Sequence, residues 1–171
     1  MKTVLLFLSI FAVSAFTETA SAQVNKNFAQ HCIGTWKGMM YIYAYGNLRD
    51  SVQVELSVAK IDDQSWKWRT DYLSEKMPVT KDYIMRLDTT SSHILLLDEG
   101  DGVVLTNYLT GTKLYANFET EGILLGSSYE WIDEKLVFEV TSGKKRNEAE
   151  ESGVTNFTVD FVQRVVLHKI P

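Results

Sequence analysis

Hydrophobic and polar residues alternate with a period of two along most of the chain after residue 33. In residues 34–45, Trp36 and Met40 stand at even positions, whereas Lys37 and Tyr43 stand at odd positions. Side chains of a strand point alternately to its two faces, so this alternation predicts a strand with one face in a core and the other near water.

Similar runs follow, separated by short clusters of turn-forming residues such as 46–50 and 98–102. Glycine, aspartate and asparagine favour tight turns, and no segment after residue 33 has a 3.6-residue period over a helical length. The predicted strands span residues 34–45, 51–61, 65–72, 81–87, 93–98, 103–109, 113–120, 123–131, 135–141 and 155–169.

Strands this short, joined by tight turns, leave no room for crossover helices and therefore form an antiparallel meander. A long meander exposes two edges unless it closes on itself. The pattern thus predicts an all-β fold, an antiparallel up-and-down β-barrel of eight to ten strands, with a short helical turn before the first strand.

The first 22 residues have the pattern of a cleaved secretory signal. Lys2 precedes an apolar run over residues 4–16, and Ala20-Ser21-Ala22 is a small-x-small cleavage pattern. The apolar run is too short to cross a bilayer, which disfavours the alternative of a retained anchor. We therefore expect residues 23–171 to form a single mature domain that is secreted or periplasmic.

Composition narrows the classes of function. A formal net charge of −5 disfavours nucleic acid, which requires a basic surface. Cys32 is the only cysteine, so no internal disulfide forms, and its place between Phe28 and Ile33 predicts that it is buried. The chain has no Ser-His-Asp pattern, no HExxH and no glycine-rich phosphate loop. We expect neither catalysis nor a bound metal or cofactor, while a site assembled from distant strands stays open.

Gly34-Thr35-Trp36 opens the first strand directly after a short polar stretch. This segment resembles the Gly-x-Trp opening of the lipocalin-like β-barrels of the calycin group. In that family the tryptophan faces inward at the closed end, and a basic residue of the last strand packs across it. The resemblance implies this role for Lys169, with Arg164 as the alternative. The fatty-acid-binding branch inserts two helices after its first strand, for which residues 46–50 leave no room.

The resemblance also implies a cavity for small, mostly apolar molecules, lined by the inward face of each strand. The alternative is that the same residues only fill a core, which the width of a ten-stranded barrel disfavours. Polar candidates on the inward faces are Thr70, Asn107, Ser127 and Gln163. Apolar and aromatic candidates are Met40, Ile42, Val54, Leu56, Trp66, Trp68, Tyr72, Tyr83, Met85, Leu96, Leu105, Phe118, Tyr129, Phe138 and Phe161.

The expected function is that of an exported protein that holds an apolar or amphipathic small molecule, such as a lipid, without transforming it. Neither His93 nor His168 has the parity of the inward face, so haem is not indicated. The alternative is a filled barrel that acts through its outer surface, where Met39, Tyr41, Tyr43 and Tyr45 would form a contact with a partner or a second copy. The loop over residues 142–153 or the N-terminal turn would otherwise cover this surface.

Overall fold

The computed structural model describes residues 28–146 and 154–171. The predicted signal peptide and most of the charged part of the predicted loop 142–153 lie outside the described residues. Residues 28–31 form one helical turn. The strands are β1 (Gly34–Ala44), β2 (Asn47–Lys60), β3 (Ser65–Tyr72), β4 (Val79–Leu87), β5 (Ile94–Gly100), β6 (Val103–Thr110), β7 (Lys113–Thr120), β8 (Ile123–Ile132), β9 (Lys135–Lys144) and β10 (Phe161–Ile170).

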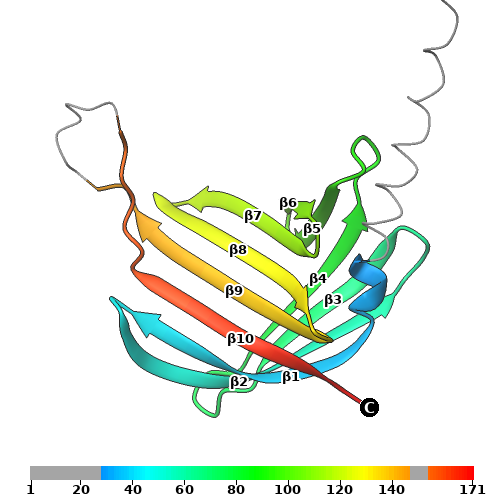
Figure 1. The fold of residues 1–171 in the computed structure, drawn as a ribbon, viewed down its shortest axis with the longest axis horizontal. Coiled ribbons are helices and arrows are strands. Elements are labelled where there is room, and N and C mark those ends of the chain that lie inside the picture. Colours follow the sequence, from blue (N-terminus) through cyan, green and yellow to red (C-terminus); the bar gives the residue numbers. More distant parts are fainter. Residues whose placement is uncertain (1–27, 147–153) are drawn as a thin grey trace, which may run out of the picture.

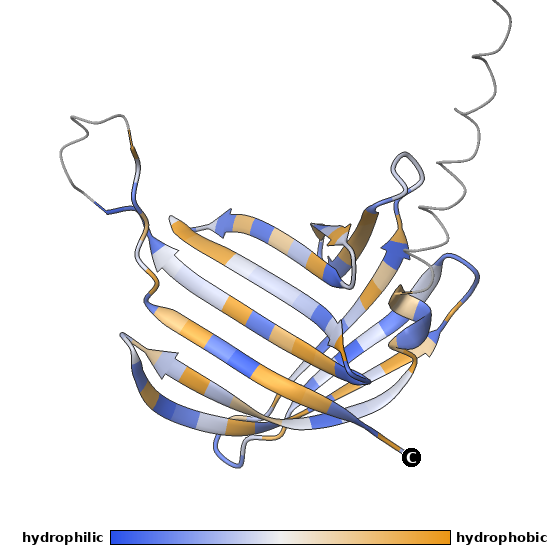
Figure 2. Cartoon of the chain, in the orientation of Figure 1, coloured by the Kyte–Doolittle hydropathy of each residue, from blue (hydrophilic) through white to orange (hydrophobic). Residues whose placement is uncertain are grey.

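The ten strands form one closed antiparallel barrel (Figure 1). Each strand pairs with its neighbours in sequence, and β1 closes the barrel by pairing with β10, from Thr35 opposite Ile170 to Ala44 opposite Phe161. The predicted all-β, up-and-down barrel with one helical turn at its start is therefore confirmed, with ten strands. Colouring by hydropathy shows the alternation within single strands, clearest on β9 and β10 (Figure 2).

The turn between β1 and β2 is shorter than predicted. Tyr45 and Gly46 have φ values of 50° and 78°, so both central residues are in the left-handed region. Two such residues make the two-residue turn whose twist matches a hairpin. Residues 47–50, predicted as turn, instead pair with β1 as exposed strand.

The last strand begins later than the predicted residue 155. Residues 154–160 still follow the end of β9, and the backbone N–H of Asp160 donates to the carbonyl of Ser142 at 2.8 Å. They lack a continuous ladder, and Phe157 and Val159 are exposed. Alternation alone could not separate this exposed segment from the paired strand.

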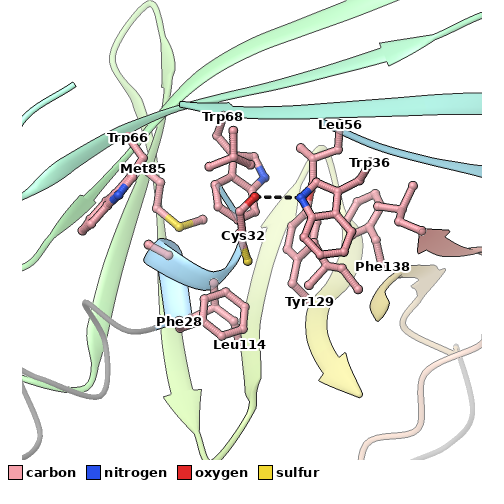
Figure 3. Packing of buried hydrophobic residues seen from close by; sticks show 14 of the residues in the cluster. Phe28, Cys32, Trp36, Leu56, Trp66, Trp68, Met85, Leu114, Tyr129 and Phe138 are labelled. Carbon is pink, nitrogen blue, oxygen red and sulfur yellow. Dashed lines mark hydrogen bonds between the residues drawn. The ribbon is translucent and has the colours of Figure 1, made fainter. Parts of the chain in front are cut away.

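The barrel has a closed end and an open end. The helical turn and the C terminus lie at the closed end, and the arrowheads of β1 and β9 point to the open end (Figure 1). Phe28 and Cys32 of the N-terminal turn are buried against the inward residues of this end, which include Trp66, Met85 and Leu114 (Figure 3). The predicted burial of Cys32 is confirmed, and desolvation raises the pKa of its thiol.

Trp36 occupies the centre of the closed end and is fully buried. Its indole Nε1 donates a hydrogen bond of 2.7 Å to the carbonyl of Cys32, which ties β1 to the helical turn (Figure 3). The ammonium of Lys169 lies 5.4 Å from the centroid of the indole ring. Gly34 has a φ of +129°, and a Cβ there would lie 2.6 Å from Cε of Lys169. The cation–π contact predicted for Trp36 and Lys169 is confirmed. The side chain of Lys169 occupies the space that a side chain at position 34 would otherwise fill.

The inward face of β5 differs from the prediction. Leu95 and Leu97 are buried, whereas Leu96 has the outward parity, so the prediction for Leu96 is wrong. Four consecutive apolar residues, 94–97, carry no alternation from which parity can be read. His93 consequently has the inward parity, but it is exposed at the closed end, and its Nδ1 shares a hydrogen bond of 2.9 Å with the Ser91 hydroxyl.

Candidate ligand-binding site

The open half of the barrel contains a cavity of about 360 Å³. It lies above the tryptophan-filled closed end and is bounded by inward residues of β3 to β10. Its lining residues are Thr70, Tyr72, Lys81, Tyr83, Leu97, Glu99, Leu105, Asn107, Phe118, Leu125, Ser127, Tyr129, Phe138, Val140 and Gln163.

Aromatic rings form the floor of the cavity. Tyr129 on β8 and Phe138 on β9 are cross-strand neighbours, and their rings stack with centroids 4.3 Å apart. Trp68 packs edge-on against Tyr129 at 5.3 Å and is fully buried below it. Stacked and edge-on pairs of this kind fix ring orientation. The floor is therefore a rigid boundary between the filled half and the hollow half.

A pair of polar side chains, Tyr83 and Glu99, lies on the wall formed by β4 and β5. The register places Met85 opposite Leu97, so the next inward residues toward the mouth, Tyr83 and Glu99, are neighbours. Burial raises the pKa of Tyr83, and the charge of Glu99 and its hydrogen bond with the tyrosine hydroxyl raise it further. The ammonium of Lys81 lies 6.0 Å from the Tyr83 ring centroid. Tyr83 thus stays protonated between a carboxylate and an ammonium group.

Asn107 places a carboxamide deep in the cavity. The residue is 3% exposed, and its Nδ2 donates a hydrogen bond of 3.1 Å to the carbonyl of Leu105. That bond fixes the orientation of the amide, because only the NH₂ group can donate to a carbonyl. The side-chain oxygen Oδ1 accepts no hydrogen bond from the residues that the structure describes, so it remains available within the cavity lining.

The other phenols of the cavity are also held in their neutral form. Burial raises the pKa of Tyr129, with a further contribution from Tyr72, and contacts with Trp68 and Thr70 partly offset this increase. The indole Nε1 of Trp68 is itself buried and makes no hydrogen bond of normal geometry. Burial also raises the pKa of Tyr72. The cavity therefore offers neutral hydroxyl groups near neutral pH.

The structure places the predicted lining residues in two groups. Those that line the cavity are Tyr72, Tyr83, Leu105, Asn107, Phe118, Tyr129 and Phe138, together with Thr70, Ser127 and Gln163. Those that face inward but pack in the core outside the cavity lining are Met40, Ile42, Val54, Leu56, Trp66, Trp68 and Met85. These residues have the predicted inward orientation, and their part in ligand binding stays a prediction. Ile42 and Val54 pair directly with Gln163 and Tyr72 of the lining.

Phe161 is the one predicted lining residue that is exposed. It starts β10 at the open rim, is 43% exposed, and its ring lies 5.9 Å from that of Tyr45. Its parity is inward, but a residue at the rim has no layer of side chains above it. Phe161 therefore lies outside the lining of this cavity, and its part in ligand binding stays a prediction.

Several cavity residues were missed by the sequence prediction. Leu97 was missed because the inward face of β5 was predicted wrongly. Leu125 and Val140 have the inward parity of Tyr129 and Phe138 on the same strands, but only the latter two were predicted as lining residues. Lys81 and Glu99 are charged residues near strand ends, which usually lie in solvent. Their inward parity was the only signal that could have identified them.

A second concavity, of about 440 Å³, lies on the outer surface over β1 and β10. The predicted outward orientation of Met39, Tyr41, Tyr43 and Tyr45 is confirmed, since all four are exposed. The residues around this groove are Gly38, Met39, Tyr41, Tyr43, Val162, Arg164, Val166 and His168. We call this surface the tyrosine face.

Two kinds of feature are absent from residues 28–146 and 154–171. These residues contain no group of three or more His, Cys, Asp or Glu side chains placed to hold a metal ion. They also contain no helix with the length and hydrophobicity needed to span a membrane.

Comparison with known proteins identifies the class of fold. No protein-family model matches the chain, and no curated protein matches it. Among solved structures, the S-type phycobiliprotein lyase CPES from Guillardia theta matches with a TM-score of 0.62 and 7% identity, over 91% of this chain and 98% of that chain. Rv2717c from M. tuberculosis matches with a TM-score of 0.54 and 13% identity, over 88% of this chain and 98% of that chain. The chain thus has a lipocalin-like barrel fold.

Proposed function

We propose that the chain is an exported protein that binds a small apolar or amphipathic molecule in the open half of its barrel and does not transform it. One observation carries this proposal. The same barrel has a closed half packed with buried tryptophans and an open half with a cavity of about 360 Å³. Ligand sites typically occupy roughly 300–1,000 Å³ and have apolar walls with a few polar groups, which describes this cavity.

The chemistry of the cavity supports binding rather than catalysis. Its three phenols have raised pKa values, so they are poor general bases near neutral pH. The lining contains no histidine and no cysteine, and its one carboxylate, Glu99, contacts a tyrosine rather than a nucleophile. CPES is a lyase, and catalysis in this cavity is the competing function. It would require turnover of a bound molecule, whereas the proposed function requires its recovery unchanged.

Export is supported by the pattern of residues 1–22. Expression in a secreting host, followed by intact-mass measurement, tests it: cleavage after Ala22 leaves a chain that begins at Gln23. A protein that retains Met1 in the cytoplasm would contradict export and leave the cavity proposal standing.

A fluorescence titration tests the cavity. N-phenyl-1-naphthylamine is a neutral probe that fluoresces in apolar surroundings, and we expect saturable binding with one site per chain. Val140→Trp fills the cavity and should abolish the signal, because Val140 is on the inward face of β9. Val137→Trp is the matched control on the outward face of the same strand and should bind as the parent does.

Native mass spectrometry of the chain purified from its own source complements the titration. A co-purifying small molecule that is absent from the Val140→Trp variant and is recovered chemically intact supports the proposal. Equal probe binding by the Val140→Trp variant and the parent would place the binding outside the barrel.

The tyrosine face favours a second candidate function, self-association. Its apolar side chains are contributed by two neighbouring strands, and Arg164 on its edge is already neutralised by Glu139 at 3.4 Å, so two copies could meet without charge repulsion. Analytical ultracentrifugation tests it. Self-association through the tyrosine face would be supported if the parent is a dimer that binds no probe and Tyr43→Ser is a monomer.

A further inference from the structure

The wall of the cavity includes two side-chain acceptors that a ligand could use, the carboxylate of Glu99 and Oδ1 of Asn107. The charged residues of the lining, Lys81 and Glu99, lie with Asn107 on β4 to β6, whereas Phe118, Tyr129 and Phe138 lie on β7 to β9; the second carboxamide, of Gln163, lies on β10. A bound molecule therefore meets a polar side and an aromatic side. The polar side determines which head group of a ligand binds in the cavity.

Glu99 is the strongest of these acceptors. Its carboxylate is half-buried, and among the described residues no lysine, arginine or histidine forms an ion pair with it. Many acidic residues on the outer surface of the barrel do have cationic partners within 4 Å, among them Glu55, Asp71, Asp82, Asp98, Glu130 and Glu139. A carboxylate inside a cavity without such a partner attracts a cation, because the charge is weakly screened there.

Tyr83 is the neighbour of Glu99 in the wall of the cavity and carries no positive charge. The tyrosine hydroxyl lies beside the carboxylate, whose charge raises the pKa of Tyr83, and the lone pairs of the carboxylate oxygens can accept from a ligand. Lys81 does not take this place, since its ammonium lies over the Tyr83 ring, and its side chain is exposed at the rim. Glu99 is thus an acceptor with which no cationic group of the described residues forms an ion pair.

Asn107 provides a second hydrogen-bond acceptor, deeper in the cavity. Its NH₂ group donates to the carbonyl of Leu105, and its Oδ1 can only accept a hydrogen bond. The residue is 3% exposed. A hydrogen-bond donor on a ligand could pair with this oxygen. The free donors Trp66 Nε1 and Trp68 Nε1 do not balance it, because both atoms are sealed in the filled half.

We propose that the ligand of this cavity carries a protonated amine or a similar nitrogen donor, which binds Glu99 at the mouth while its apolar body lies against Phe118, Tyr129 and Phe138. This inference rests on the proposed function and deepens it by naming the head group. It excludes a free carboxylic acid as the preferred ligand, because the carboxylate would face Glu99.

Displacement of N-phenyl-1-naphthylamine by octylamine, octanol and octanoate tests the head group with a constant apolar body. We expect octylamine to displace the probe at a concentration about tenfold lower than octanol, the size expected for a hydrogen bond to a charged group, and octanoate to be weakest. Added salt should reduce the octylamine advantage and leave octanol unchanged, a readout that needs no variant.

Glu99→Gln keeps the size of the side chain and removes its charge, so the octylamine and octanol concentrations that displace the probe should become equal in this variant. Glu119→Gln removes the same charge from the outer face of β7, where Glu119 is exposed, and should keep the advantage. Probe binding by each variant shows that its barrel is intact.

Two outcomes would overturn the inference. One is strongest displacement by octanoate, lost in Lys81→Gln, which would assign the head group to the lysine. The other is equal displacement by all three compounds. In both cases the probe still binds, so the proposed function survives. Failure of the parent to bind any probe or alkyl compound would instead contradict the proposed function itself.

Discussion

The closed and open halves of this barrel are made by the same strands with the same alternation, yet one half is solid and the other hollow. In the closed half the inward residues include Trp36, Trp66 and Trp68, and the N-terminal turn adds Phe28 from below. In the open half the inward positions include smaller or polar residues such as Ser127 and Thr70. Alternation decides where a side chain points, and side-chain volume decides whether a cavity remains.

The largest expected effect concerns the centre of the closed half. Trp36→Ala removes a fully buried ring, its hydrogen bond to Cys32 and its contact with Lys169, and should lower the free energy of unfolding by about 3–5 kcal/mol. Phe118→Ala in the open half should cost clearly less, since its ring already borders a cavity and loses fewer contacts. Chemical denaturation of both variants measures the difference, and equal losses would refute the contrast between the halves.

A smaller effect is expected from two glycines. In Gly38→Ala the new Cβ would overlap the backbone carbonyl of Val166 in the closed half, where nothing can move aside, so we expect a loss of about 1–3 kcal/mol. In Gly126→Ala, near the open end, the Cβ would meet only the side chains of Asn117 and Thr141, each at 3.1 Å. Those side chains can rotate, and thermal unfolding should show the smaller shift for Gly126→Ala.

Asn107→Leu should separate stability from binding in the open half. The change removes the hydrogen bond from Nδ2 to Leu105 and adds apolar volume to the cavity, so the two effects oppose each other and the free energy of unfolding should stay within about 1 kcal/mol of the parent value. Probe affinity should fall in the same variant, because the cavity shrinks. Leu114→Asn, a change of opposite sense in the closed half, should destabilise the fold strongly. A loss of more than about 2 kcal/mol in Asn107→Leu would show that the bond to Leu105 outweighs the added apolar contact.

The smallest expected effect is on alkaline stability. Tyr72, Tyr83 and Tyr129 have raised pKa values and all line the open half. A raised folded-state pKa means that the native state binds the proton more tightly than the unfolded state. The stabilisation is therefore complete below the ordinary tyrosine pKa of about 10 and is lost as the pH rises above it. Unfolding curves recorded at increasing pH should show a shallower loss for Tyr83→Phe than for the parent, and the exposed Tyr115→Phe should not differ from the parent.

Residues that alternate cleanly made most of the fold predictable from the sequence. On β2 and β3 the buried Val54, Leu56, Trp66 and Trp68 follow the predicted parity, and the contact of Trp36 with Lys169 follows from the family resemblance at Gly34-Thr35-Trp36. For the candidate site, the sequence predicted only which side chains point into the barrel. Trp68 and Tyr129 have the same inward orientation, but only Tyr129 borders the cavity, because distance from the mouth depends on strand tilt and register across the barrel.

The polar residues of the site show the same limit. Asn107 was identified by its parity, but its free acceptor is visible only once Leu105 is seen to take its NH₂ group. Glu99 was not identified, because it stands beside the turn at residues 100–102, where acidic residues are usual. Its pairing with Tyr83 depends on the register of β4 against β5, which the sequence does not contain.

Closure of the barrel between β1 and β10 has a consequence for how the chain reaches this structure. Thr35 pairs with Ile170, so the ladder that closes the barrel joins the beginning of the domain to its last residues. All the other ladders join neighbours in sequence and can form early as hairpins. Contacts between such distant residues slow folding, because the loop between them must be ordered first. Until β10 has left the ribosome and docked, β1 and β9 expose unpaired edges, and this interval is when the chain is most prone to aggregate.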